Sequence, residues 1–190
     1  MPNVTTIPRA AVALTGVAAL ALALYGGLAQ AAPTVGQPAP DFTAIDSNGA
    51  TQQLSAQRGS TVVLEWTNHD CPFVRKHYDT DNMQALQNDA KAKDIVWWSV
   101  ISSAPGKQGY VSPAEANALT ASRNAAPAAV LLDTDGKVGR LYGARTTPHM
   151  YIIDPEGRLV YMGGIALAAL ESGRAVNPAS TRPYGCSVKY

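Results

Sequence analysis

The stretch TVVLEWTNHDCPFVRKHY, residues 61–78, combines an apolar strand, a polar loop and the start of a helix around a single cysteine. Its first six residues are β-branched or otherwise mostly apolar, which predicts a central strand covered on both faces. Pro72 suits the first turn of a helix, and the apolar spacing from Phe73 to Lys91 predicts one helix there. The sequence therefore places Cys71 between a buried strand and a helix N-terminus.

This position gives Cys71 the features of a nucleophile. Unpaired N–H groups and the dipole at a helix N-terminus favour the thiolate. The polar loop before it, residues 67–70, is expected to be open to solvent, which argues against an inert buried cysteine. A C-x-x-C redox motif would repeat the cysteine three residues later, where this chain has Val74. A resolving thiol must therefore come from elsewhere.

Length and composition predict one globular domain, and the balanced charge excludes a function based on a strongly charged surface. The chain has 190 residues, of which 46% are apolar and 15% charged, and this suits a single domain with a proper core. Its 15 basic and 14 acidic residues give no basic field for nucleic acid. Function must therefore be sought in a site.

The first 31 residues have the pattern of a secretory signal peptide. An apolar run ends before Gly26-Gly27, and Ala29-Gln30-Ala31 has the small-x-small form that signal peptidase cuts. The alternative is an uncleaved membrane anchor, because residues 10–29 form a segment about 20 residues long. We expect cleavage after residue 31 and a periplasmic or secreted domain over residues 32–190, where a disulfide can persist.

Strands and helices alternate along the rest of the chain before a hairpin and a last helix. This order predicts an α/β fold with a mixed central sheet sandwiched by helices. Ser112 starts a helix in capping-box form, with Pro113 and Glu115 behind it. The other expected elements are two short strands around Asn48-Gly49, strands over 95–101 and 128–133, a short helix to Tyr142, a hairpin around Asp154-Pro-Glu-Gly157, and a last helix after Gly164.

The segment Thr146-Thr147-Pro148-His149 lies between the short helix and the hairpin. A peptide bond before proline can be cis, although about 95% of such bonds in folded proteins are trans. Two alternatives stay open: a cis-proline turn, or a trans proline that starts a strand.

Two motifs at opposite ends of the chain carry a resemblance to a known family. Residues 68–74 read NHDCPFV, and residues 185–190 read GCSVKY. With the order of elements and the TTP segment, they make residues 35–165 similar to the thioredoxin superfamily, and more closely to its redoxin or alkyl hydroperoxide reductase/thiol-specific antioxidant group. Within it the chain resembles the peroxiredoxin-like branch that keeps only the first cysteine of the thioredoxin pair.

The resemblance implies a thioredoxin-like fold with an N-terminal β extension and a C-terminal tail. It makes Cys71 the attacking thiol, Pro148 the cis-proline that faces it, and Thr147 the backbone that aligns an extended substrate beside the sulfur. Pro72 joins these substrate-positioning residues. Relatives usually carry an acidic loop that this chain lacks, which leaves the path of the tail open.

The tail, residues 174–190, contains the second cysteine, Cys186. The 12 residue steps from Arg174 to Cys186 reach up to about 40 Å if extended, so Cys186 can return to Cys71. Asn68 stands where peroxiredoxins, three residues before their peroxidatic cysteine, have a threonine. That family also aligns this cysteine with the position of Val74 here, which puts peroxide reduction in doubt.

Three function classes stay open. The first is an exported thiol-disulfide oxidoreductase in which Cys71 attacks and Cys186 resolves. The second is a thiol peroxidase, and the third is a non-enzymatic binding module with a structural Cys71–Cys186 disulfide. The expected partners are protein or small-molecule thiols and disulfides, with no nucleic acid, no cofactor, and membrane contact only through an uncleaved signal segment.

The three histidines offer further chemistry. His69 and His77 lie close to Cys71 in sequence, and either can relay a proton, the alternative for each being a solvated polar side chain. With Cys71 and His149 they form a set that in principle suits a soft metal ion such as copper, but we expect no metal site.

Overall fold

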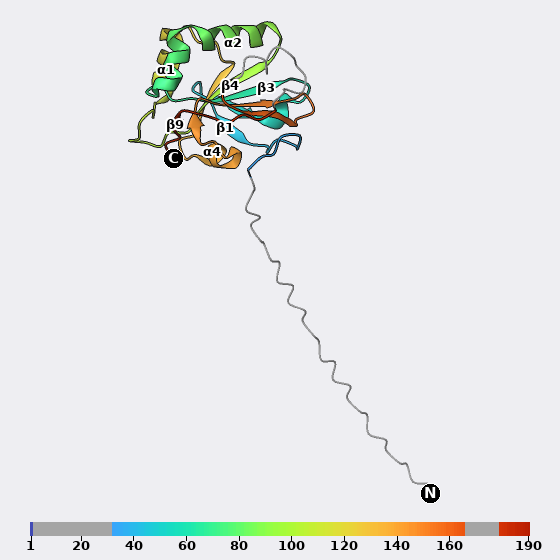
Figure 1. Ribbon diagram of the computed structural model, residues 1–190. Helices are drawn as coiled ribbons and strands as arrows, with labels where there is room; N and C mark the ends of the chain where they lie inside the picture. Colours follow the sequence, from blue (N-terminus) through green and yellow to red (C-terminus); the bar gives the residue numbers. More distant parts are fainter. Residues whose placement is uncertain (2–31, 166–178) are drawn as a thin grey trace.

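The computed structural model describes residue 1, residues 32–165 and residues 179–190 (Figure 1). The expected signal segment and the expected last helix lie outside these residues, apart from Met1 and Ile165. Within the described part, no helix is both long enough and apolar enough to cross a membrane.

The centre of the fold is a five-stranded mixed sheet with the order β5-β4-β3-β7-β8. Strand β3 runs parallel to β4, and β4 parallel to β5, while β7 lies antiparallel to both β3 and β8. Every residue of β3 and β7 is buried, which confirms the central strand predicted from the opening stretch. The strands are β3 (Val62–Trp66), β4 (Val96–Ile101), β5 (Ala129–Leu132), β7 (His149–Ile153) and β8 (Leu159–Gly163).

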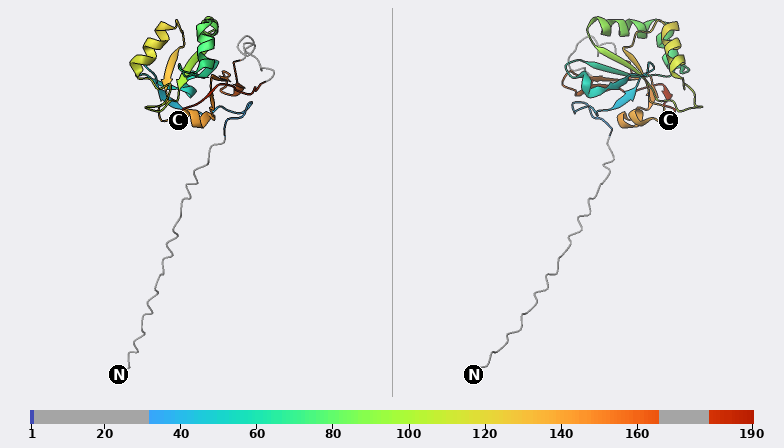
Figure 2. Two further views of the ribbon diagram at one scale, coloured as in Figure 1. Left: turned by 60° about the vertical axis from the view of Figure 1, so that its left-hand side comes forward. Right: turned by 180° about the vertical axis from the view of Figure 1, so that it is seen from behind.

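Helices cover both faces of this sheet (Figure 2). Side chains alternate along a strand, so neighbouring residues face opposite layers. Val63 and Trp97 pack among residues of α1 and α2, whereas Leu64 and Trp98 pack in the other layer, which includes residues of α4. Among residues 32–165 and 179–190 the helices are α1 (Pro72–Asp79), α2 (Asn82–Ala92), α3 (Pro113–Ser122) and α4 (Lys137–Tyr142), with a 3-10 turn η1 (Leu54–Gln57).

The single helix predicted over residues 73–91 is wrong, because the chain breaks between α1 and α2. Asp81 has a φ of 56°, in the left-handed region, and precedes the first residue of α2. The buried positions show why: Tyr78 and Met83 are five residues apart, where one continuous helical face needs a spacing of three or four. Ala85, which fits the single-helix pattern, is exposed.

Two local predictions are confirmed. Ser112 accepts a hydrogen bond from the Glu115 backbone N–H and completes the capping box of α3. Around Asn48-Gly49, strands β1 (Thr43–Ile45) and β2 (Thr51–Gln53) pair antiparallel and form the N-terminal β extension. The mixed sheet with helices on both sides is thus as expected.

Candidate active site at the start of helix α1

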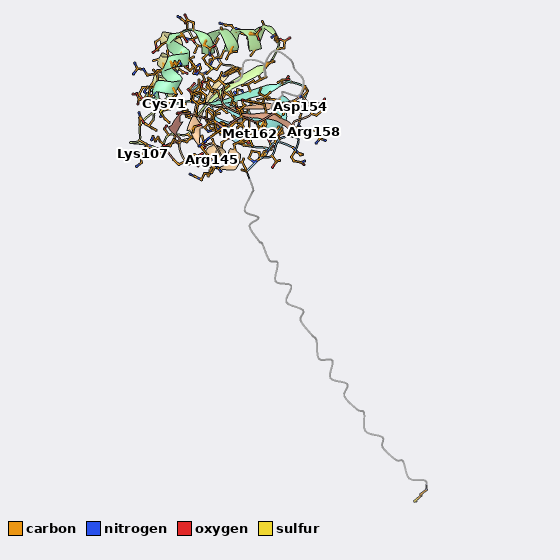
Figure 3. All side chains as sticks on the ribbon, viewed as in Figure 1. Cys71, Lys107, Arg145, Asp154, Arg158 and Met162 are labelled. Atoms are coloured by element: carbon orange, nitrogen blue, oxygen red, sulfur yellow. A yellow bond between two sulfur atoms is a disulfide. The ribbon has the colours of Figure 1, made fainter. Side chains whose placement is uncertain are left out.

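Cys71 lies at the junction that the sequence predicts. It is the N-cap residue of α1, and Pro72 is the first residue of the helix. The Arg75 N–H donates to the Cys71 carbonyl oxygen at 2.9 Å, which begins the helical hydrogen bonding. Figure 3 shows Cys71 at one end of the sheet, while Asp154 and Arg158 of the hairpin turn lie at the other.

The expectation of a solvent-open loop before Cys71 is confirmed only for its second half, where His69 is half-buried and Asp70 is exposed. Cys71 is 0% exposed, and Thr67 and Asn68 are buried as well. The segment around Gly109 covers Asn68: the Asn68 side chain donates to the Gln108 carbonyl oxygen at 3.3 Å, and a Cβ at Gly109 would overlap the Asn68 amide. The polar loop residues are thus partly used in contacts with a segment about 40 residues later.

Cys71 forms a disulfide with Cys186, with Cα atoms 5.9 Å apart and a separation of 115 residues in sequence. Strand β9 (Cys186–Ser187) pairs antiparallel with β6 (Thr146–Thr147), and Thr147 is the register partner of Cys186. The returning tail therefore adds a short strand directly beside the cysteine junction.

The Thr147–Pro148 peptide bond is cis. The Thr147 carbonyl oxygen lies 3.1 Å from the Cys71 Sγ atom. Of the residues predicted to position substrate, the structure thus brings Thr147 against the sulfur, and the segment that lies along Thr147 is the protein's own tail.

The tail is anchored before Cys186. The Thr181 N–H donates to the Met162 carbonyl oxygen at 3.2 Å, and the Thr181 hydroxyl lies 2.8 Å from the Tyr161 hydroxyl. Closer to Cys186, the Tyr184 ring packs edge-on against Phe73, with ring centroids 5.9 Å apart. These contacts attach the tail residues before Cys186 to β8 and to the exposed side of α1.

A second anchor follows Cys186. The Val188 N–H donates to the Arg145 carbonyl oxygen at 3.0 Å. The Tyr190 hydroxyl donates to the Ala144 carbonyl oxygen at 2.7 Å. The Tyr190 ring occupies a slot on α4 where a Cβ at Gly139 would overlap it. The motif GCSVKY thus supplies the disulfide cysteine and two residues that contact the rest of the fold, Val188 and Tyr190.

A buried carboxylate ties α1 to the strand before it, and the sequence prediction missed it. Glu65 is 0% exposed and accepts hydrogen bonds from the Tyr78 hydroxyl at 2.9 Å and the Trp97 indole at 2.9 Å. Ser99 and Gln87 donate to the same group. Burial raises the pKa of Glu65, and these hydrogen bonds oppose the shift. An acidic residue inside an otherwise apolar strand was the signal in the sequence.

The three histidines do not converge. The Nε2 atom of His69 lies 3.3 Å from the Oδ1 atom of Asp70. The Nε2 atom of His77 lies 3.4 Å from the hydroxyl oxygen of Tyr184 in the tail. His149 is buried beside Tyr151, and desolvation by burial lowers its pKa to about 4, with Arg145 a further cause.

No hydrogen bond among the described residues joins His69 or His77 to Cys71, so the relay roles stay predictions. No group of three or more His, Cys, Asp or Glu side chains in residues 32–165 and 179–190 is arranged to hold a metal ion.

Comparisons with known proteins identify the family of the chain. The sequence matches the model of the AhpC/TSA family over residues 35–162. Thiol-disulfide oxidoreductase ResA of Bacillus subtilis is 25% identical over 154 residues, 80% of each chain.

Two solved structures are similar. An uncharacterized conserved protein from Geobacillus kaustophilus has a TM-score of 0.72 at 25% identity, over 83% of this chain and 92% of that one. A protein of Chlorobium tepidum described as a thiol:disulfide interchange protein DsbE has a TM-score of 0.57 at 27% identity, over 74% and 93%. With its thioredoxin-like fold and thiol-disulfide oxidoreductases among its relatives, the chain belongs to the AhpC/TSA family.

Proposed function

We propose that the protein is an exported thiol-disulfide oxidoreductase of the peroxiredoxin-like branch, with Cys71 as the attacking thiol and Cys186 as the resolving thiol. The observation that carries the proposal is the position of Cys186, which is disulfide-bonded to Cys71 and register partner of Thr147. The tail thus supplies the second thiol that Val74 does not. ResA, a relative by sequence, is a thiol-disulfide oxidoreductase by name.

Export and domain limits are part of the proposal. Residues 1–31 act as a cleaved signal peptide, and residues 32–190 form one domain with residues 174–190 as its tail. The support is the sequence pattern of residues 10–31. A periplasmic or secreted location also suits a disulfide that persists.

The proposed reaction has two exchange steps. The Cys71 thiolate attacks one sulfur of a partner disulfide, forms a mixed disulfide and releases the other partner sulfur as a thiolate, which takes up a proton. The Cys186 thiolate then attacks the Cys71 sulfur, forms the Cys71–Cys186 disulfide and releases the second partner thiol. The partner is reduced by two electrons and the protein is oxidised by two. An outside dithiol returns it to the reduced form.

A structural clamp is the second candidate, and two observations favour it. Cys71 is fully buried, and the tail has anchors on both sides of Cys186 that do not involve the cysteines. In the clamp reading the disulfide stays closed throughout. A thiol peroxidase is the third, and Asn68 in place of the expected threonine weighs against it.

The test is Cys186→Ser in the reduced protein, mixed with a model disulfide. We expect a covalent adduct on Cys71, seen by intact mass and on non-reducing gels, because the resolving thiol is gone. Cys71→Ser should form none. Placing cysteine at Val74 in the Cys186→Ser background should restore turnover, since Val74 is buried in the same apolar cluster as Cys71. A Cys186→Ser protein that traps nothing and keeps its reductase rate contradicts the resolving role.

A further inference from the structure

We propose that the tail is a built-in copy of the preferred substrate. On this proposal, the site takes extended protein segments in which an aromatic residue and a glycine precede the reactive cysteine and an aliphatic residue stands two positions after it. The inference rests on the proposed function. It goes further by naming the substrate class, which is read from the contacts of Tyr184 to Val188.

The glycine requirement follows from the pairing of Cys186 with Thr147. A Cβ at Gly185 would overlap the carbonyl oxygen of Thr147 and would lie 2.7 Å from its carbonyl carbon. These are backbone atoms beside Pro148, so they cannot rotate away as a side chain could. Gly185 also has a φ of 148°, which L side chains rarely adopt. Any cysteine segment bound in this register therefore meets the same restriction.

The two residues after the cysteine differ in what they contact. Ser187 is exposed, and its hydroxyl meets only Lys189 of the tail itself among the hydrogen bonds of the described residues. Val188 is half-buried, packs against the hydrophobic core and donates its N–H to Arg145. The position directly after the cysteine is therefore free, whereas the next position selects a compact aliphatic side chain.

On the other side of the cysteine, an aromatic contact leads into the site. Phe73, two residues after Cys71, is 44% exposed, and the Tyr184 ring packs edge-on against it. Large exposed aromatic side chains beside a reactive group are typical of binding surfaces. A substrate with an aromatic residue before the glycine would repeat this contact once β9 leaves β6.

The test uses the full-length, reduced Cys186→Ser protein and a short peptide with the sequence Tyr-Gly-Cys-Ser-Val, its thiol held as a mixed disulfide with thionitrobenzoate. The Cys71 thiolate attacks the peptide sulfur, the peptide becomes disulfide-bonded to Cys71, and the coloured thionitrobenzoate leaves. We expect the Ala peptide, with alanine for glycine, to react at least about tenfold more slowly, since backbone overlap is not relieved by rotation. The matched control replaces the peptide serine by alanine and should react at about the same rate.

A second measurement tests the glycine requirement in the protein's own tail. In wild-type background, Gly185→Ala should shift the thiol-disulfide equilibrium of Cys71 and Cys186 with glutathione toward the reduced form by at least about tenfold. Ser187→Ala is the control and should leave the equilibrium unchanged. Circular dichroism of the reduced proteins separates this shift from a general loss of folding.

Each outcome decides between the two proposals. Equal rates for the glycine and alanine peptides, no reaction of any peptide, or an unchanged equilibrium in Gly185→Ala overturns the substrate copy. The proposed function fails instead if Cys71 does not react even with the small disulfide dithiobis-nitrobenzoate, which requires no glycine.

Discussion

The two cysteines of one disulfide have very different surroundings. Cys71 is fully buried at the junction of β3 and α1, two elements that the Glu65 carboxylate joins through Tyr78. Cys186 lies on a two-residue strand and is only partly buried. Its position depends on one anchor at Thr181 and another at Tyr190. Cys71 belongs to the scaffold, which is formed here by β3 and α1. Cys186 belongs to the strap, the part of the tail over residues 179–190 that packs against the rest of the fold.

The tail around Cys186, rather than Cys71, is the part expected to move in the proposed reaction. Buried scaffold residues open only with a large part of the free energy of unfolding, whereas a short strap with few buried contacts opens locally at lower cost. Opening the disulfide should therefore leave Cys71 in place and let β9 separate from β6.

Cutting the disulfide between Cys71 and Cys186 should destabilise the protein most. Reducing the Cys71–Cys186 disulfide removes a cross-link over 115 residues and should lower the free energy of unfolding by about 5 kcal/mol in the loop-entropy model. Urea unfolding with and without reductant measures it. Cys186→Ser, which has no disulfide, should not respond to reductant; a response there, or no change in the wild type, contradicts this account.

Removing the Glu65 carboxylate should destabilise the buried surroundings of Cys71. Glu65→Ala removes the acceptor of Tyr78, Trp97 and two further buried donors, so we expect a loss of about 4 kcal/mol, more than a single unpaired buried group costs. Urea unfolding of the oxidised proteins measures the loss. Asp89→Ala, which removes a half-exposed carboxylate paired with Lys93, is the matched control and should change stability by less than about 1 kcal/mol.

Glu65 also predicts the direction of a pH effect. Its pKa is raised by burial, so the folded state keeps the proton to a higher pH than the unfolded state does. Stability from this group is therefore present at low pH and falls as the pH rises above the ordinary glutamate pKa of 4.5. Glu65→Gln should flatten that part of the curve of unfolding free energy against pH. An unchanged slope would mean that Glu65 is not the group that titrates.

Much of the scaffold side could be predicted from the sequence, because its signals are local. The apolar run before Cys71 and the proline after it place the cysteine at a strand-to-helix junction, and the structure has it there. The Thr147–Pro148 bond, left open between cis and trans, is cis. The break between α1 and α2 was missed, although the spacing of five residues between Tyr78 and Met83 does not fit one continuous helical face.

The strap side could be predicted only in part, because its contacts are all long-range. Chain length allowed Cys186 to reach Cys71, but it gave neither the register with Thr147 nor the slot for Tyr190. The burial of the loop around Asn68 depends likewise on a segment about 40 residues away. Such pairings leave no periodic pattern in either segment.

A smaller effect on stability is expected from His149, which follows the cis peptide bond between Thr147 and Pro148. His149, next to Pro148, has a pKa lowered to about 4 by burial, with Arg145 contributing, against 6.5 ordinarily. The folded state thus binds its proton less readily, so stability is full above about pH 6.5 and is lost as the pH falls toward 4, by about 3 kcal/mol. His149→Gln should remove this loss. Urea unfolding at pH 7, 5.5 and 4 compares the two proteins, and parallel curves would contradict the assignment.

Removing the Tyr190 hydroxyl should have the weakest effect, and it changes the tail alone. Tyr190→Phe keeps the ring in its slot against Gly139 but removes the hydrogen bond to Ala144, so the oxidised protein, whose tail is docked, should lose about 1 kcal/mol of stability and the reduced protein less. If the anchor positions Cys186, the disulfide should also open more readily in a glutathione buffer, by roughly fivefold for that free energy. Tyr110→Phe, at an exposed tyrosine, is the control and should change neither quantity. A disulfide equilibrium that does not respond to Tyr190→Phe, in a protein that does lose stability, would mean that the strap holds Cys186 through Thr181 and the β6–β9 pairing alone.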